Sequence, residues 1–262
     1  MKHNHNGQKD KLQKILARAG LGSRRKMEEK ITQGKVLVNG KPARIGDRAS
    51  RSDKITVDGR PLKNQAVFLT RPRVILYHKP EGEICTRSDP EGRKTVFDAL
   101  PRLKKGRWVI VGRLDINTSG LLLFTTDGEL ANRLMHPSYQ IEREYAVRTF
   151  GECSDKALQQ LKTGVVLDDG KARFNAICFA GGEGRNRWYH VRLSEGRNRE
   201  VRKMFEAVDV TVSRLTRIRF GEVKLPRWIN AGKSEELAAS EVNSLRRSVG
   251  MHAFHFPKAL YR

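Results

Sequence analysis

The chain has 262 residues and carries 52 Lys and Arg against 29 Asp and Glu, a formal net charge of +23. This excess favours a polyanionic partner, because cationic side chains that neutralise phosphates release condensed counterions. An acidic membrane surface is the competing explanation. No apolar run reaches the roughly 18–20 residues that span a bilayer, and the first ten residues lack an apolar signal-peptide core, so we expect a cytoplasmic protein. Cys85, Cys153 and Cys178 lie far apart without a CxxC pair, which indicates neither a disulfide framework nor a zinc cage.

The first 60 residues predict a compact α/β module. Leu12, Ile15 and Leu16 share one face of a helix, and Ser23 is a suitable N-cap for a second one. Two short alternating runs follow, and Asn39-Gly40 predicts a hairpin between strands. The expected helices cover residues 11–19 and 24–33, and the expected strands cover residues 36–38 and 55–57.

The basic charge of this module is concentrated at the start of its second helix. Residues 1–62 hold 16 Lys and Arg against 6 Asp and Glu, a net charge of +10, and Arg24, Arg25 and Lys26 open that helix. A run of charge on a helix is often only a solvated surface. Here it coincides with helix amides that favour phosphate, so we expect these three residues to contact an RNA backbone.

A polar linker over residues 61–72 precedes a second domain. Its expected strands follow one another without intervening helices in several places, which predicts a mixed or antiparallel sheet. The strands are expected at residues 73–77, 108–111, 121–125, 145–150, 172–179, 188–193 and 210–220, and the helices at 128–135, 154–162 and 198–208. The tail from residue 234 predicts a helix followed by a basic, aromatic end. These patterns divide the chain into residues 10–70, 73–232 and 233–262.

The segment Gly112-Arg113-Leu114-Asp115-Ile116-Asn117-Thr118-Ser119-Gly120-Leu121-Leu122-Leu123-Phe124 carries the clearest chemical signal. It sets Asp115 in a polar turn between two apolar strands. A carboxylate held there is costly unless something pairs with it, and such a setting tunes acid/base or nucleophilic behaviour. The alternative is that Asp115 only satisfies turn amides, and the residues alone leave both interpretations open. Asp127, just before Gly128 and a helical run, is expected to be an N-cap.

At this segment the chain resembles the pseudouridine synthases that modify ribosomal RNA. G-R-L-D-x-x-T-S-G-L-L-L-F-T-x-D-G is similar to their catalytic motif, and Glu142-Arg143-Glu144-Tyr145 is similar to their second motif. The stretch from Arg192 to Met204 is similar to their third motif. K-L-Q-K-I-L-A-R-A-G-L-G-S-R-R resembles the αL-type, S-four RNA-binding domain that this branch carries before its catalytic domain.

The resemblance implies an α+β protein: a small RNA-binding domain, then a catalytic domain with a mixed, mostly antiparallel sheet flanked by helices. It implies that a uridine within RNA is isomerised without a cofactor, with Asp115 acting at the sugar as nucleophile or as base toward C2′. Tyr145 would stack on the uracil, and Arg202 would form an ion pair with Asp115. We expect no metal, including at His3 and His5.

The resemblance also implies where RNA is held. Arg113 would brace the flipped nucleotide, and Arg197 and Arg199 would hold phosphates. Residues 171–230 contain 14 Lys and Arg against 6 Asp and Glu, so a second basic zone of +8 would complete a two-part RNA clamp.

Within this family, C-T-R-S-D-P-E-G-R-K and S-E-G-R-N-R-E-V-R-K resemble the members that act on the large subunit, so the resemblance implies large-subunit (23S) RNA as substrate. A monomer is expected. The alternatives are a synthase for small-subunit (16S) RNA and a non-catalytic RNA-binding or ribosome-assembly protein.

Overall fold

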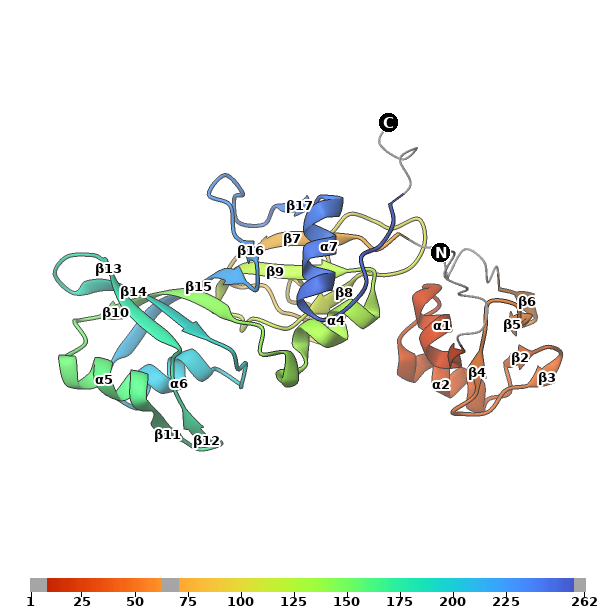
Figure 1. The fold of residues 1–262 in the computed structure, drawn as a ribbon, viewed down its shortest axis with the longest axis horizontal. Helices are drawn as coiled ribbons and strands as arrows, with labels where there is room; N and C mark the ends of the chain where they lie inside the picture. The colour runs from red at the N-terminus through yellow and green to blue at the C-terminus, as the bar shows by residue number, and fades with distance from the viewer. Residues whose placement is uncertain (1–8, 63–70, 257–262) are drawn as a thin grey trace.

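The computed structural model describes residues 9–62 and 71–256, which form two domains that we call the N-terminal module and the large domain (Figure 1). His3 and His5 and most of the expected linker lie outside the described residues. No helix of the described ranges has both the length and the apolar character needed to cross a membrane.

The N-terminal module has two helices packed on short antiparallel strands. Leu12, Ile15 and Leu16 do share one face and are fully buried with Met27, and Ser23 caps the second helix by accepting from the Lys26 amide at 3.1 Å. The predicted helices and strands of this module are therefore confirmed, with small changes at their ends. Its elements are α1 (Leu12–Arg18), α2 (Arg24–Thr32), a sheet in the order β3 (Lys41–Pro42), β2 (Val36–Val38), β5 (Ile55–Val57), β6 (Arg60–Pro61), and the pair β1 (Asp10–Lys11) and β4 (Arg48–Ala49).

The large domain is built on one nine-stranded sheet, whose main path has the order β13-β14-β10-β15-β9-β7-β17. Every pairing in it is antiparallel except β15 with β9, which confirms the mixed, mostly antiparallel sheet. Its strands are β7 (Val74–Lys79), β8 (Val109–Val111), β9 (Ser119–Thr125), β10 (Arg143–Phe150), β13 (Ala176–Gly181), β14 (Asn186–Leu193), β15 (Thr211–Phe220), β16 (Val223–Lys224) and β17 (Ser234–Glu236). A separate hairpin joins β11 (Val165–Leu167) to β12 (Gly170–Ala172).

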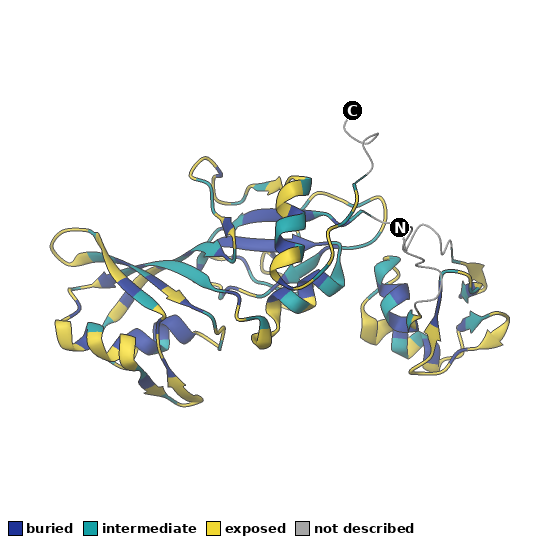
Figure 2. Ribbon diagram, viewed as in Figure 1, coloured by how far each residue is buried: buried dark blue, intermediate teal, exposed yellow. Residues whose placement is uncertain are grey.

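Helices cover different parts of this sheet, and the buried residues lie between the layers (Figures 1 and 2). Leu121 and Leu123 of β9 join a core with residues of α4 (Gly128–Met135) and α7 (Ala239–Ser248). Leu122 and Phe124 alternate to the other side of the strand and pack with Tyr77 and Trp108. A third core includes residues of α5 (Asp155–Thr163) and α6 (Glu200–Glu206), and a short 3-10 turn, η2, spans Pro137–Tyr139.

Two expectations for the large domain were wrong. Residues 172–179 are not one strand, since β12 ends at Ala172 and β13 begins at Ala176. The tail does not begin as a helix at residue 234, because Ser234–Glu236 adds as an edge strand to β7 and the helix starts only at Ala239. A polar strand such as Ser-Glu-Glu has no alternating pattern to reveal it.

β9 and β15 pair at only two positions, Ser119 with Thr216 and Gly120 with Arg217. Gly120 has a φ of +107°, and a Cβ there would lie 2.3 Å from the Arg217 carbonyl oxygen. Only glycine fits this approach. The two halves of the sheet, and the loops that each carries, are thereby joined next to Asp115.

Candidate active site

Asp115 lies in the connection between the antiparallel strands β8 and β9. β9 is almost entirely buried and β8 ends at the buried Val111, and the Thr118 amide closes the turn between them by donating to the Asp115 carbonyl at 3.1 Å. Leu114 is buried among Tyr77, Trp108 and Leu122, and fixes the turn to the core from one side. The Asp115 side chain is half-buried and makes no ion pair or hydrogen bond with another described residue. It is thus a carboxylate on a fixed backbone with its oxygens available.

A buried lysine also fixes the backbone of this turn. The Lys79 ammonium, at the end of β7, is completely buried and donates to the carbonyls of Asp115 at 3.1 Å, Thr118 at 2.9 Å and Pro80 at 2.9 Å. Burial lowers the pKa of Lys79, while nearby thiol and carboxylate groups, Asp115 among them, oppose that shift. Sequence reasoning missed Lys79, although a lysine two residues after the apolar run Val-Ile-Leu-Tyr was the available signal.

Arg202, on α6, is a second buried cation that holds the turn. Its guanidinium donates to the carbonyls of Asn117 at 2.8 Å and Val212 at 2.9 Å, and the side chain is buried. The expected ion pair with Asp115 is not formed in the structure, where the two terminal nitrogens donate to these backbone carbonyls instead. Burial lowers the pKa of Arg202, and the Asp115 charge acts in the other direction. Arg202 thus fixes the peptide groups beside Asp115 and contributes positive charge near its carboxylate.

Tyr145 and Arg217 are direct partners on adjacent strands, and Arg217 is in turn the partner of Gly120. The Tyr145 ring is half-buried where two core clusters meet, and its hydroxyl makes no hydrogen bond with another described residue. Arg217 is almost fully buried, donates to the Leu121 carbonyl at 2.7 Å, and retains one terminal nitrogen without a partner. Sequence reasoning missed Arg217, which stands among arginines on a strand where nothing marks it as buried.

The expected RNA-binding arginines fall into two groups. Arg113, beside Asp115, is exposed and makes no ion pair with any described residue, and Arg199 is also exposed but lies 3.6 Å from Glu206. Arg197 is occupied inside the protein, because it pairs with Asp169 at 3.2 Å and Glu195 at 2.6 Å and donates to three carbonyls of the β11–β12 hairpin. Arg197 therefore holds the loop before α6 in place rather than presenting a free cation.

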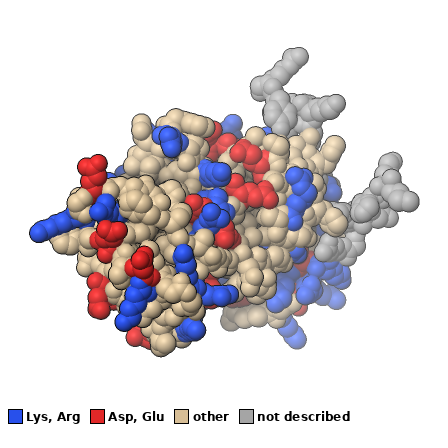
Figure 3. Space-filling view, turned by 60° about the vertical axis from the view of Figure 1, so that its left-hand side comes forward, with Lys and Arg blue, Asp and Glu red and all other residues tan. Residues whose placement is uncertain are grey.

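Positive and negative side chains alternate over the surface of the large domain. On the face seen in Figure 3, Lys and Arg side chains are interspersed with Asp and Glu. Arg219, for example, pairs with Glu142 and Glu144 at 2.5 and 2.9 Å. In the N-terminal module, by contrast, Arg24, Arg25 and Lys26 are exposed. Within the described ranges no group of three or more His, Cys, Asp or Glu side chains is arranged to hold a metal ion.

Comparison with known proteins agrees with this arrangement. The sequence profile of RNA pseudouridylate synthase matches residues 73–207, and that of the S4 domain matches residues 10–55. The chain is 58% identical over 242 residues to ribosomal large subunit pseudouridine synthase B of Yersinia pestis, covering 92% of this chain and 76% of that protein. It is 57% identical to the protein of the same name from Escherichia coli (strain K12), covering 92% and 83%.

A solved crystal structure of a pseudouridylate synthase has the same fold, with a TM-score of 0.62 and 25% identity over 90% of this chain and 99% of that chain. The two profiles follow the domain order seen in the structure, and the matched region contains Asp115, Tyr145 and Arg202. The chain belongs to the RNA pseudouridylate synthase family.

Proposed function

We propose that this protein isomerises a uridine to pseudouridine in 23S ribosomal RNA of the large subunit. The observation that carries the proposal is the Asp115 carboxylate, whose oxygens are free of described partners on a turn fixed by two buried cations. The relatives that are 57–58% identical over most of the chain are named for this activity on the large subunit.

The chemistry requires one reactive carboxylate and a site that excludes water from the sugar. The N1–C1′ bond breaks, the uracil turns, C5 bonds to C1′, C5 loses a proton and N1 gains one, so the reaction has no net oxidation and needs no cofactor. Asp115 acts at the sugar, as a nucleophile at C1′ or as a base at C2′. Glycosidases pair a second carboxylate with water. Here the buried Leu114 and Leu122 beside the turn disfavour water at the sugar.

A uridine within folded RNA must leave its stack to reach Asp115, at a cost of a few kcal/mol. The Tyr145 ring offers a stacking surface for the flipped uracil, and the exposed Arg113 and Arg199 offer cations for its flanking phosphates. Arg24, Arg25 and Lys26 of the N-terminal module supply further contacts to the RNA backbone. All of these groups come from one chain, so we propose that it acts as a monomer, in the cytoplasm where the ribosomal RNA is found.

The direct test is chemical mapping of pseudouridine across both ribosomal RNAs in cells that lack this protein. We expect one large-subunit site to be missing and to return with the wild-type gene but not with Asp115→Asn. A missing small-subunit site would contradict the choice of subunit. If no site were missing, a non-catalytic role in RNA binding or ribosome assembly would replace the enzymatic one.

Arg202→Lys tests how Arg202 acts. A lysine keeps the positive charge but cannot bond the Asn117 and Val212 carbonyls at once as the planar guanidinium does. We expect kcat to fall by about 10-fold or more, since small displacements of a reacting group are costly. RNA affinity should change by less than about threefold, because the side chain is buried away from the backbone of the RNA. A lysine variant with wild-type kcat would show that charge alone is needed.

A further inference from the structure

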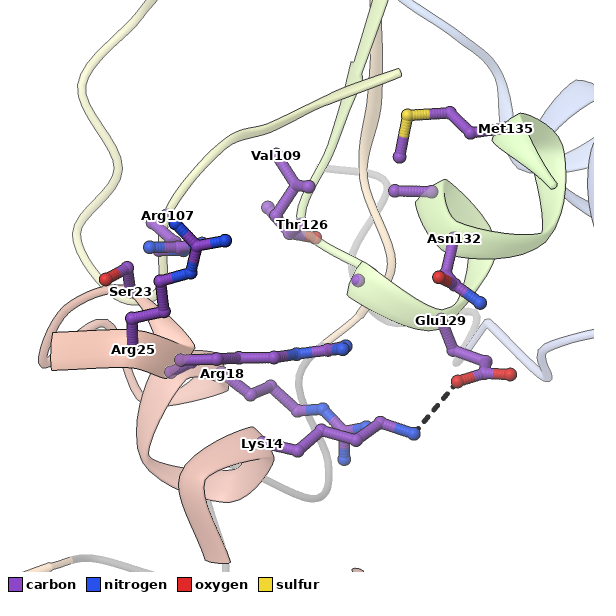
Figure 4. A pocket seen from close by; sticks show the side chains of 14 residues that line it. Lys14, Arg18, Ser23, Arg25, Arg107, Val109, Thr126, Glu129, Asn132 and Met135 are labelled. Atoms are coloured by element: carbon purple, nitrogen blue, oxygen red, sulfur yellow. Dashed lines mark hydrogen bonds and ion pairs between the residues drawn. The ribbon is translucent and has the colours of Figure 1, made fainter. Parts of the chain in front are cut away.

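A cavity of about 340 Å³ lies between the two domains, outside the Asp115 site (Figure 4). Residues of α1 and α2 line one side, and residues of β8, α4 and the segment before β8 line the other. An ion pair of 2.9 Å between Lys14 and Glu129 crosses it. Gly20 and Gly106 also meet across the domains, so closely that a Cβ on Gly20 would lie 2.9 Å from the Gly106 carbonyl oxygen. The cavity is therefore formed by docking of the N-terminal module on the large domain.

Three arginines face this cavity without a carboxylate partner. Arg24 and Arg25 come from the N-terminal module and Arg107 from the large domain, and none of them makes an ion pair with a described residue. The other two cations of the lining differ, since Lys14 pairs with Glu129 and Arg18 with Asp10. Burial lowers the pKa of Arg107, and the nearby Arg24 charge lowers it further. Like charges from the two domains thus line one cavity, and the one carboxylate among its lining residues, Glu129, pairs with Lys14 and Arg133 instead.

We propose that this cleft binds one backbone phosphate of the substrate RNA, and that the bound phosphate joins the two domains. The inference rests on the proposed function, and it adds Arg107 and a shared site to the RNA contacts. Planar guanidinium groups match phosphate oxygens in pairs, and the cavity has room for one phosphate group. Because the cations belong to both domains, the phosphate removes the repulsion that opposes docking. By linkage, docking then raises the affinity for RNA.

A double-mutant cycle on RNA binding tests the shared site. Arg24→Gln, Arg107→Gln and the double variant are titrated with an in vitro transcript of the large-subunit rRNA segment that contains the target uridine, between 50 and 200 mM salt. We expect each single variant to weaken binding by roughly 5- to 20-fold and to reduce the slope of log K against log salt by about one. The double variant should be little weaker than either single variant, since both arginines serve one phosphate. Arg247→Gln removes an exposed charge from α7 and should change affinity by less than about twofold.

Gly20→Ala provides a second test without changing charge, because its Cβ would push Gly106 away. We expect it to weaken RNA binding and to reduce the salt slope as Arg107→Gln does. Additive effects in the cycle, or variants that match Arg247→Gln, would overturn the proposal. Inorganic phosphate is titrated in parallel, and arginine-dependent binding of phosphate with arginine-independent binding of RNA would also overturn it. Turnover of the same transcript by the wild-type chain separates the two proposals: no turnover contradicts the enzymatic function, whereas turnover with unchanged affinity in the variants contradicts only the cleft.

Discussion

Asp115→Asn is expected to reduce pseudouridine formation by at least about 10⁴-fold, the scale seen when a group that reacts directly with substrate is removed. An amide is nearly isosteric with the carboxylate, so the turn should keep its shape: Lys79 and Arg202 hold its carbonyl groups, not the Asp115 side chain. Single-turnover assays with saturating RNA measure the chemical step, and RNA affinity measured beside them should change by less than about threefold.

Glu81→Gln is the matched control for this prediction. Glu81 is exposed, and its charge acts on both Lys79 and Arg202, as the Asp115 charge does. The Glu81→Gln substitution therefore removes a negative charge that acts on the same two cations but leaves the reacting carboxylate in place. Turnover should stay within about tenfold of wild type. If the two variants lost the same share of turnover, Asp115 would act only through the electrostatic effect of its charge. An Asp115→Asn variant that still formed pseudouridine at the wild-type rate would contradict the proposed role.

Local patterns were sufficient for much of the fold. The predicted helix over residues 128–135 matches α4 at both ends, and Asp127 caps it by accepting from the amides of Glu129 and Leu130. Capping and hydrophobic periodicity are properties of a few neighbouring residues, so the sequence displays them directly. The β17 strand was missed because its place is set by pairing with β7, more than 150 residues earlier in the chain, and not by its own composition.

The site likewise combines residues that local sequence reveals with residues that only long-range pairing reveals. Asp115 is marked by its turn and flanking strands, whereas Lys79 and Arg217 became visible only when the sheet brought β7, β9 and β15 together. Arg202 was selected for an ion pair, yet its partners are the Asn117 and Val212 carbonyls. Sequence motifs identify which residue types meet, but the choice between a carboxylate and a backbone carbonyl depends on distances of a few ångströms that only the packed structure determines.

Lys79→Met is expected to damage the site without touching substrate. Methionine fills a similar volume but donates no hydrogen bond, so the carbonyls of Asp115, Thr118 and Pro80 lose a buried donor. Buried groups left without a partner cost about 1–3 kcal/mol each, and partial rehydration should limit the total loss of unfolding free energy to roughly 2–4 kcal/mol. We expect kcat to fall by about 100-fold, because the Asp115 backbone is no longer fixed. Thermal or denaturant unfolding and single-turnover kinetics measure the two effects.

Lys233→Met is the control, since Lys233 is an exposed lysine next to β17 and should alter neither quantity by a measurable amount. The informative comparison is between stability and kcat in Lys79→Met. Lys79 belongs to β7 and Arg202 to α6, which pack in different core clusters, so the turn is held between the two parts of the large domain. If Lys79→Met lowered stability while kcat stayed at the wild-type value, the buried Leu114 would be sufficient to orient Asp115. A fall in kcat well beyond the loss of folded protein would instead show that the position of Asp115 depends on both parts of the domain at once.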